Sequence, residues 1–114
     1  MRRAPLKEAA MKKVLEKDIQ SEILLYLKGD KTHIGRGGVW VNMHGGSPCM
    51  NAGLPDIIGC YDGRFVAFEV KRPGGRLTKL QALWLQKIRD AGGVAEVVYS
   101  REQVIHILNK IDRG

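Results

Sequence analysis

Apolar residues that recur every three or four positions predict three amphipathic helices along this chain. The predicted helices cover residues 17–28, 77–91 and 101–112. Gly29 follows the first helix and Gly92 follows the second, as is usual at helix C-termini. Ser100 with Gln103 resembles a capping box that begins the third. On the second helix we expect the buried stripe to contain Leu80, Leu83, Trp84 and Ile88.

Short runs rich in β-branched and aromatic residues predict four strands. The predicted strands cover residues 39–43, 57–61, 65–70 and 94–100. Asp62-Gly63 is a strong hairpin signal, and pairing of Tyr61 with Phe65 would carry Asp56 alongside Val70. Because a helix precedes the last strand, this order predicts an α/β fold with a mixed four-stranded sheet flanked by helices.

The length of 114 residues suits one domain with a real core and is short for two. We expect residues 1–16 to form a basic N-terminal segment, flexible or helical, and residues 17–114 to form a single domain. Nineteen Lys and Arg against twelve Asp and Glu give a net charge of +7. This excess favours a polyanionic partner such as nucleic acid or an anionic membrane surface, although a merely soluble basic protein has the same composition.

Two further patterns limit the possible sites and locations. Cys49 and Cys60 are not spaced as a zinc-binding or redox pair, so neither a zinc site nor a disulfide framework is indicated. No run approaches the roughly 18 apolar residues of a membrane span, and the basic start lacks a signal-peptide core. We therefore expect a cytoplasmic protein that does not insert into a membrane.

Two carboxylates and an ammonium interrupt otherwise apolar strand sequence. Side chains alternate along a strand, so Glu69 and Lys71 share one face while Phe68 and Val70 point into a core. Asp56, at the start of the partner strand, joins Glu69 at one end of the hairpin. A Mg²⁺ ion would make this burial tolerable, with the Val70 carbonyl as a third oxygen ligand. A salt bridge of Lys71 with either acid, on an exposed sheet face, explains the same spacing.

The sequence "GLPDIIG", followed after a short turn by "FVAFEVK", resembles the motif of the PD-(D/E)XK nuclease superfamily. From about Asp18 to Asn109 the chain resembles the VRR-NUC domain, the virus-type replication-repair nuclease, which is similar in architecture to archaeal Holliday-junction resolvases. The resemblance implies an αβββαβ restriction-endonuclease-like core, to which the last predicted helix is added. It also implies a DNA endonuclease that uses Mg²⁺ or Mn²⁺ to hydrolyse phosphodiester bonds.

Carried over residue by residue, the resemblance gives Asp56 and Glu69 the role of metal-binding carboxylates. The Val70 carbonyl would be a further metal ligand, and Lys71 would be the catalytic lysine.

The resemblance implies roles for two more residues, and each has a simpler alternative. Glu22 on the first helix would be the acidic residue that such nucleases direct at the metal, or else a solvated residue beside an apolar stripe. Gln81 would be the family's active-site glutamine, or only the last member of a capping box that starts at Thr78.

DNA contacts are expected from basic residues close to the motif. Arg72, Arg76 and Lys79 follow it directly and suit a sequence-independent grip on phosphates. Arg36, in the glycine-rich loop 31–38, could approach a phosphate or simply belong to a loop.

The resemblance favours a substrate of branched DNA, a Holliday junction or a flap, cut by a homodimer. A restriction-type or nicking endonuclease and a non-catalytic DNA-binding module are the alternatives.

Overall fold

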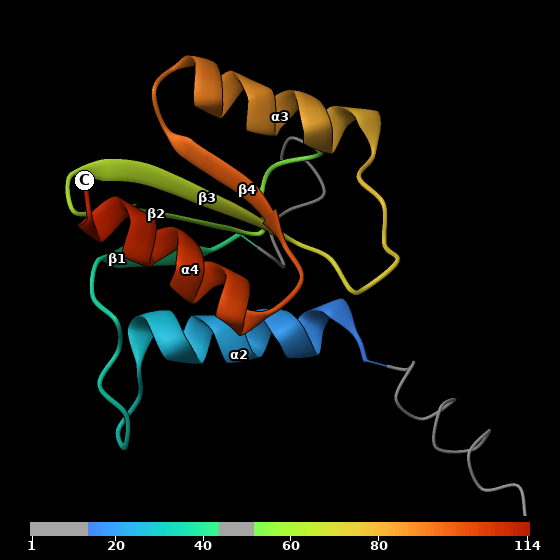
Figure 1. Ribbon diagram of the computed structural model, residues 1–114. Helices are drawn as coiled ribbons and strands as arrows, with labels where there is room; N and C mark the ends of the chain where they lie inside the picture. Colours follow the sequence, from blue (N-terminus) through green and yellow to red (C-terminus); the bar gives the residue numbers. More distant parts are fainter. Residues whose placement is uncertain (1–13, 44–51) are drawn as a thin grey trace, which may run out of the picture.

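The computed structural model describes residues 14–43 and 52–114, which form a central sheet covered by helices on both faces (Figure 1). The helices are α2 (Glu16–Lys28), α3 (Lys79–Asp90) and α4 (Arg101–Asp112). The strands are β1 (Val39–Asn42), β2 (Ile57–Tyr61), β3 (Arg64–Val70) and β4 (Val94–Val98). None of the helices within these residues is long and apolar enough to cross a membrane.

The sheet has the order β1-β2-β3-β4. The first three strands are antiparallel neighbours, whereas β4 lies parallel to β3. The parallel pair requires a crossover, and α3 supplies it between β3 and β4. The predicted mixed four-stranded sheet with flanking helices and a C-terminal helix is therefore confirmed.

The hairpin between β2 and β3 has a tighter turn than the sequence suggested. Asp62 and Gly63 both adopt positive φ, 51° and 78°, as a two-residue type I′ turn requires. Tyr61 consequently pairs with Arg64, and Ile57 pairs with Phe68. The predicted pairing of Tyr61 with Phe65 is wrong by one residue, because it assumed a three-residue loop. Continued by one step, the observed register brings Asp56 opposite Glu69 itself.

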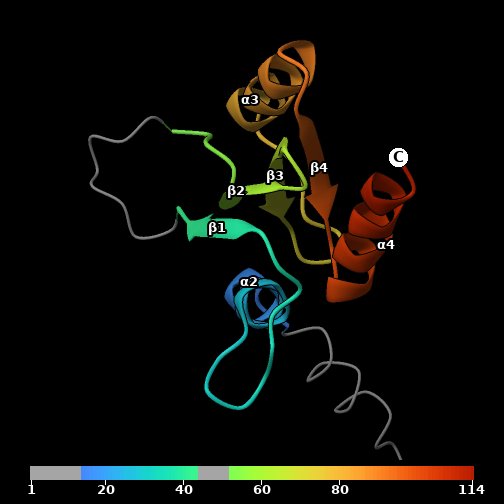
Figure 2. The same ribbon diagram turned by 90° about the vertical axis from the view of Figure 1, so that its left-hand side faces the viewer.

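Alternation along β3 divides its side chains between two cores. Val66, Phe68 and Val70 pack toward α2 and α4, in a cluster with residues of both helices. Ala67 faces α3 instead and packs with Ala95 and Leu85. Figure 2 shows α3 on the opposite side of the sheet from α2 and α4. By the same alternation Glu69 lies on the α3 face of the sheet, at the end of the strand.

The exposed side of α3 differs from the predicted one. Leu85 is the fully buried residue of the helix, whereas Leu80 and Leu83 are exposed, Leu83 by 49%. Trp84 is half-buried, with Lys87 Nζ 5.7 Å from its ring centroid, so its assignment to the core is wrong in part. The reason is that α3 rests on small alanines of β3 and β4, which admit the Leu85 side of the helix.

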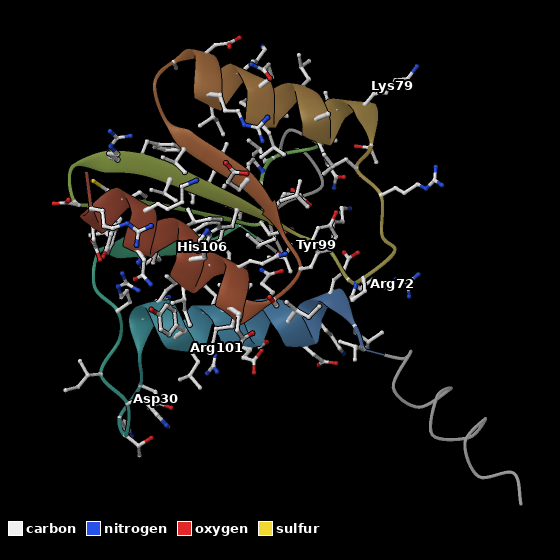
Figure 3. The ribbon with its side chains drawn as sticks, viewed as in Figure 1. Asp30, Arg72, Lys79, Tyr99, Arg101 and His106 are labelled. Atoms are coloured by element: carbon white, nitrogen blue, oxygen red, sulfur yellow. The ribbon has the colours of Figure 1, made fainter. Side chains whose placement is uncertain are left out.

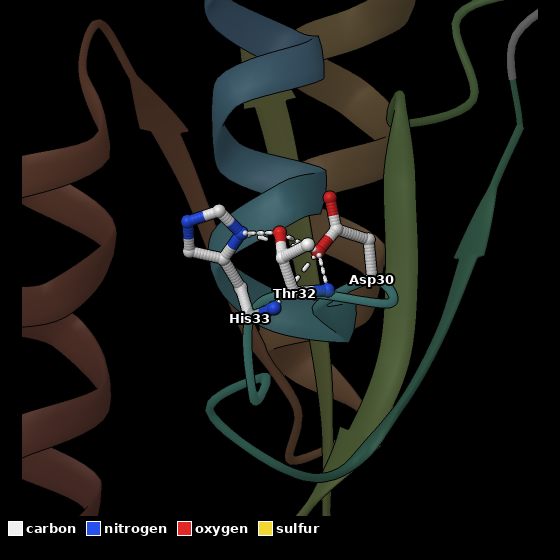
Figure 4. Close-up of polar contacts among 3 residues, drawn as sticks. All are labelled: Asp30, Thr32 and His33. Carbon is white, nitrogen blue, oxygen red and sulfur yellow. Dashed lines mark hydrogen bonds and ion pairs between the residues drawn. The ribbon is translucent and has the colours of Figure 1, made fainter.

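The connection from α2 to β1 turns around Asp30 (Figure 4). Its Oδ1 accepts hydrogen bonds from the backbone N–H groups of Thr32 at 2.8 Å and His33 at 2.9 Å. The hydrogen bond from the Thr32 backbone, with those from the His33 and Thr32 side chains, lowers the pKa of Asp30 to about 2. The loop thus fixes its own shape, and His33 is engaged in that turn, away from the acidic residues of the hairpin.

Candidate active site

Asp56 and Val70 are joined directly at the end of the β2–β3 hairpin. The Asp56 carboxylate accepts a hydrogen bond from the Val70 backbone N–H at 2.8 Å from Oδ2. In an extended strand the N–H and C=O of one residue point to the same edge. The Val70 carbonyl therefore faces the Asp56 side of β3, where the sequence placed it as a ligand.

Glu69 is the buried acid of the site, only 2% exposed. Its Oε2 accepts a hydrogen bond from Gln81 Nε2 at 3.1 Å. Its Oε1 is buried and has no hydrogen-bond partner among the residues that the structure describes. Burial and, after it, the negative charge of Asp56 raise the pKa of Glu69 to about 8, although the positive charge of Lys71 opposes them. Without a cation this carboxyl group is mostly protonated at neutral pH.

Lys71 completes the charged group. Its Nζ lies 3.9 Å from Glu69 Oε2, and its side chain is 10% exposed. The contact between Lys71 and an acid that the sequence allowed is present, but both side chains are buried, so it is not a salt bridge on an exposed sheet face. A buried ion pair needs further partners to offset desolvation, and the free oxygen of Glu69 shows that the set is incomplete.

Gln81 completes the predicted capping box and also contacts the buried acid. Its Oε1 accepts the Thr78 N–H at 2.9 Å, and Thr78 Oγ1 accepts the Gln81 N–H at 3.1 Å, which completes the capping box. Its Nε2 still reaches Glu69. The start of α3 and the buried acid are therefore coupled through one amide side chain.

The donor set fits a hard divalent cation. The carboxylates of Asp56 and Glu69 and the Val70 carbonyl are oxygen donors, and Glu69 Oε1 is buried without a partner. Across residues 14–43 and 52–114, no group of three or more His, Cys, Asp and Glu side chains is placed to hold a metal. The protein thus offers a partial shell, which suits Mg²⁺ or Mn²⁺ better than zinc, because Mg²⁺ commonly keeps several waters.

A comparison with models of protein families gives a match to the part of the chain that contains Asp56, Glu69 and Lys71. Residues 48–102 match the model of the VRR-NUC domain. This stretch is similar to a VRR-NUC domain and covers just under half of the chain, including β2, β3, α3 and β4. VRR-NUC domains belong to the PD-(D/E)XK nuclease superfamily, so the match implies a nuclease-type function in DNA processing, with DNA as a partner. Searches of curated proteins and of solved structures found no match.

Five of the predicted site residues lie inside the VRR-NUC match and are brought together by the fold: Asp56, Glu69, Val70, Lys71 and Gln81. The predicted acid on α2 lies outside the match and is placed differently. Glu22 is exposed and lines a groove with Ile19 and Arg72. Within the described residues, no hydrogen bond or ion pair joins Glu22 to these four side chains or to Val70.

Glu16 is the α2 carboxylate that the sequence analysis missed. Its charge adds to the causes that raise the pKa of Glu69. A β-carbon at Gly75 would lie 3.4 Å from Glu16 Oε2 and 3.5 Å from Lys71 Cβ, so Glu16 approaches the loop that follows Lys71. The available signal was Gln20, one helical turn later, which is buried and donates to Asn42 Oδ1 at 2.7 Å. A polar residue on the buried face marks the side of α2 that turns toward this site.

The basic residues after the motif are available to DNA. Arg72, Arg76 and Lys79 are all exposed, in the loop that ends β3 and at the first residue of α3. Figure 3 labels Arg72 and Lys79, whose side chains project outward on the side of the molecule where this loop lies. These three exposed residues, here called the positive rim, follow the buried Lys71 closely in the chain.

Arg36 belongs to a different part of the molecule. Its guanidinium donates to the Tyr26 hydroxyl, to the Tyr61 hydroxyl at 3.1 Å, and to Asp112 Oδ2 at 2.6 Å. Burial alone would lower the pKa of Arg36, but these bonds outweigh it and raise the pKa. With its side chain 16% exposed and bonded to the end of α4, Arg36 is not available for a phosphate, and the predicted DNA contact is replaced by a structural role.

Proposed function

We propose that this protein is a Mg²⁺- or Mn²⁺-dependent DNA endonuclease that hydrolyses phosphodiester bonds. The observation that carries the proposal is the state of Glu69, a buried acid with one unpartnered oxygen, beside Asp56 and Lys71. A fold does not keep such a group for stability alone, because an unsatisfied buried carboxyl group costs free energy. It is the arrangement expected of a site that functions with a cation bound.

Each residue has a distinct role in this proposal. The carboxylates of Asp56 and Glu69 and the Val70 carbonyl hold the cation. When bound, the cation lowers the pKa of a water molecule and offsets charge on the phosphate. Lys71 orients the attacking water or stabilises the negative charge that develops on the phosphoryl oxygens. Gln81 fixes the rotamer of Glu69 by donating to Oε2.

The additional acid on the first helix is assigned to Glu16 in place of Glu22. Glu16 acts electrostatically on Glu69, whereas no such effect of Glu22 is found. Its negative charge would add to the attraction for a divalent cation, although Glu16, Asp56 and Glu69 do not form a group placed to hold one.

The exposed basic residues of the positive rim indicate how DNA is held and which class of DNA is bound. Arg72, Arg76 and Lys79 would neutralise backbone phosphates without reading bases. We therefore assign the enzyme a branched substrate, a Holliday junction or a flap, recognised by shape. A homodimer would present two such sites to one junction.

The test is a cleavage panel of Holliday junction, flap, single-stranded and linear duplex DNA with Mg²⁺ or Mn²⁺. We expect cleavage of branched DNA by the wild type and its loss in Asp56→Asn, while DNA binding in EDTA persists in both. Asp62→Asn, in the hairpin turn, is the matched control, because Asn tolerates the positive φ of that position. Wild-type protein that binds but never cuts would establish a non-catalytic module instead, and cleavage of linear duplex at fixed base sequences would establish a restriction-type enzyme.

A further inference from the structure

A groove of about 620 Å³ opens beside the loop that follows Lys71. Its lining includes residues of α2, the loop and the segment before α4: Ile19, Glu22, Arg72, Pro73, Tyr99 and Ser100. Figure 3 labels Arg72 and Tyr99 on the same side of the molecule as this loop. The groove is distinct from the acidic group, because neither Asp56 nor Glu69 lines it.

The chemistry of the lining is that of a site for an unpaired nucleobase. Tyr99 is 38% exposed, so its ring offers an aromatic surface of the kind on which bases stack. Glu22 is a hydrogen-bond acceptor for an amino group on a base edge, as carboxylates are for cytosine N4. Arg72 supplies a positive charge for the phosphate attached to that base. Ile19 and Pro73 contribute apolar surface between these polar groups.

The position of the groove indicates which nucleotide it would receive. Arg72 follows Lys71 directly in the chain, and consecutive α-carbons are about 3.8 Å apart. The groove therefore begins one residue after Lys71, which would serve the phosphate that is cut. The occupant is expected to be a nucleotide next to the phosphodiester that is cut.

Resting on the proposed function, we infer that this groove captures an unpaired base of the DNA strand flanking the scissile phosphodiester. A base within a duplex has both faces stacked and its pairing edge occupied, so it cannot meet Tyr99 and Glu22 together. The volume of the groove is in the range of small-ligand sites and suits a single nucleotide. Glu22 would repel a second phosphate at the same place, which leaves the base as the group that enters.

The experiment measures binding of the full-length chain in EDTA, so that cleavage does not enter. The probes are a flap DNA with 2-aminopurine as the first unpaired base and a duplex of the same length. Stacking on an aromatic ring is worth enough that its loss weakens binding by roughly tenfold. We expect Tyr99→Ala to lose about that factor for the flap and to abolish the quenching of 2-aminopurine, with duplex affinity unchanged.

Four variants make the result interpretable. Tyr99→Phe keeps the ring and should keep both affinity and quenching. Phe65→Ala removes another exposed aromatic ring, from the start of β3, and should change neither. Glu22→Gln should alter the preference between cytosine and thymine at the unpaired position, while Glu96→Gln, exposed on β4, should not.

The inference is overturned if Tyr99→Ala binds and quenches like the wild type, or if flap and duplex affinities fall equally. Either result would leave the groove to another occupant, such as a peptide or the duplex backbone. Failure of the proposed function would give a different result. A wild type that quenches 2-aminopurine fluorescence in EDTA but never cuts DNA with Mg²⁺ or Mn²⁺ would support the inference about the groove and contradict only the nuclease activity.

Discussion

Gln81 donates from Nε2 to Glu69 Oε2 at 3.1 Å while its Oε1 accepts the Thr78 N–H that begins α3. One side chain therefore caps the start of a helix and restrains the buried acid of the site. The two functions are separable by mutation, because the cap also depends on Thr78. Thr78 is exposed, and its hydrogen bonds are with Gln81 and not with Glu69.

Thr78→Ala and Gln81→Ala should differ in activity more than in stability. Loss of an N-cap costs about 1 kcal/mol of unfolding free energy, and both variants should show it in urea denaturation. Gln81→Ala should also lower Mg²⁺-dependent cleavage by roughly 10- to 100-fold, the usual effect of losing a group that orients a metal ligand. Thr78→Ala should stay within a few-fold of the wild type. Equal loss of cleavage in the two would mean that Gln81 acts only through the cap.

The raised pKa of Glu69 makes the stability of the metal-free protein depend on pH. The folded value is about 8 and the ordinary value is 4.5, so folding binds a proton between them. The stability that comes from protonated Glu69 is complete below pH 4.5 and is lost as pH rises through about 8.

In EDTA the melting temperature of the wild type should therefore fall between pH 6 and pH 9 more than that of Glu69→Gln, which cannot ionise. Added Mg²⁺ should stabilise the wild type more at pH 8.5 than at pH 6, because binding requires the ionised carboxylate. Parallel melting curves for the two proteins in EDTA would contradict the assignment of this carboxyl group.

Arg36 is predicted to stabilise the fold and to leave DNA binding alone. Arg36→Met removes the donors to Tyr61 and Asp112 and leaves these acceptors without their charged partner. The expected cost is on the order of 1–3 kcal/mol of unfolding free energy. Arg64→Met, at an exposed position beside the hairpin turn, is the charge-matched control and should cost little. A loss of DNA affinity specific to Arg36→Met would return this residue to the DNA interface.

The limits of prediction from sequence are visible on α2 and α3. β2 was predictable to the residue, because an apolar run between Pro55-Asp56 and Asp62-Gly63 has clear boundaries. The start of α2 had no such signal, since its N-cap is Leu15, which forms no side-chain cap. A helix predicted from residue 17 left out Glu16.

The buried face of α3 was not predictable from spacing alone. Leu80, Leu83 and Trp84 recur at helical intervals. Leu85 likewise lies three residues from Ala82 and from Ile88, so the spacing fits either face of the helix. The buried face is set by the packing of Leu85 against Ala67 and Ala95 of the sheet, which are distant from it in sequence. The acidic group was predictable because strand alternation and the hairpin both act over a few residues, and a one-residue error of register left its members adjacent.

The positive rim should be detectable through salt. Each phosphate contact contributes a slope of about −0.9 to the dependence of log affinity on log salt concentration. Arg76→Ala and Lys79→Ala should each reduce the magnitude of this slope by about 1 on a junction and on a linear duplex alike, because phosphate contacts do not depend on sequence. Lys110→Ala, exposed on α4, removes the same charge away from the rim and should leave the slope nearly unchanged. Fluorescence anisotropy in EDTA between 50 and 200 mM salt would measure all four proteins, in the range where such contacts dominate affinity. Equal slopes in every variant would show that only net charge attracts DNA and that the rim does not contact it.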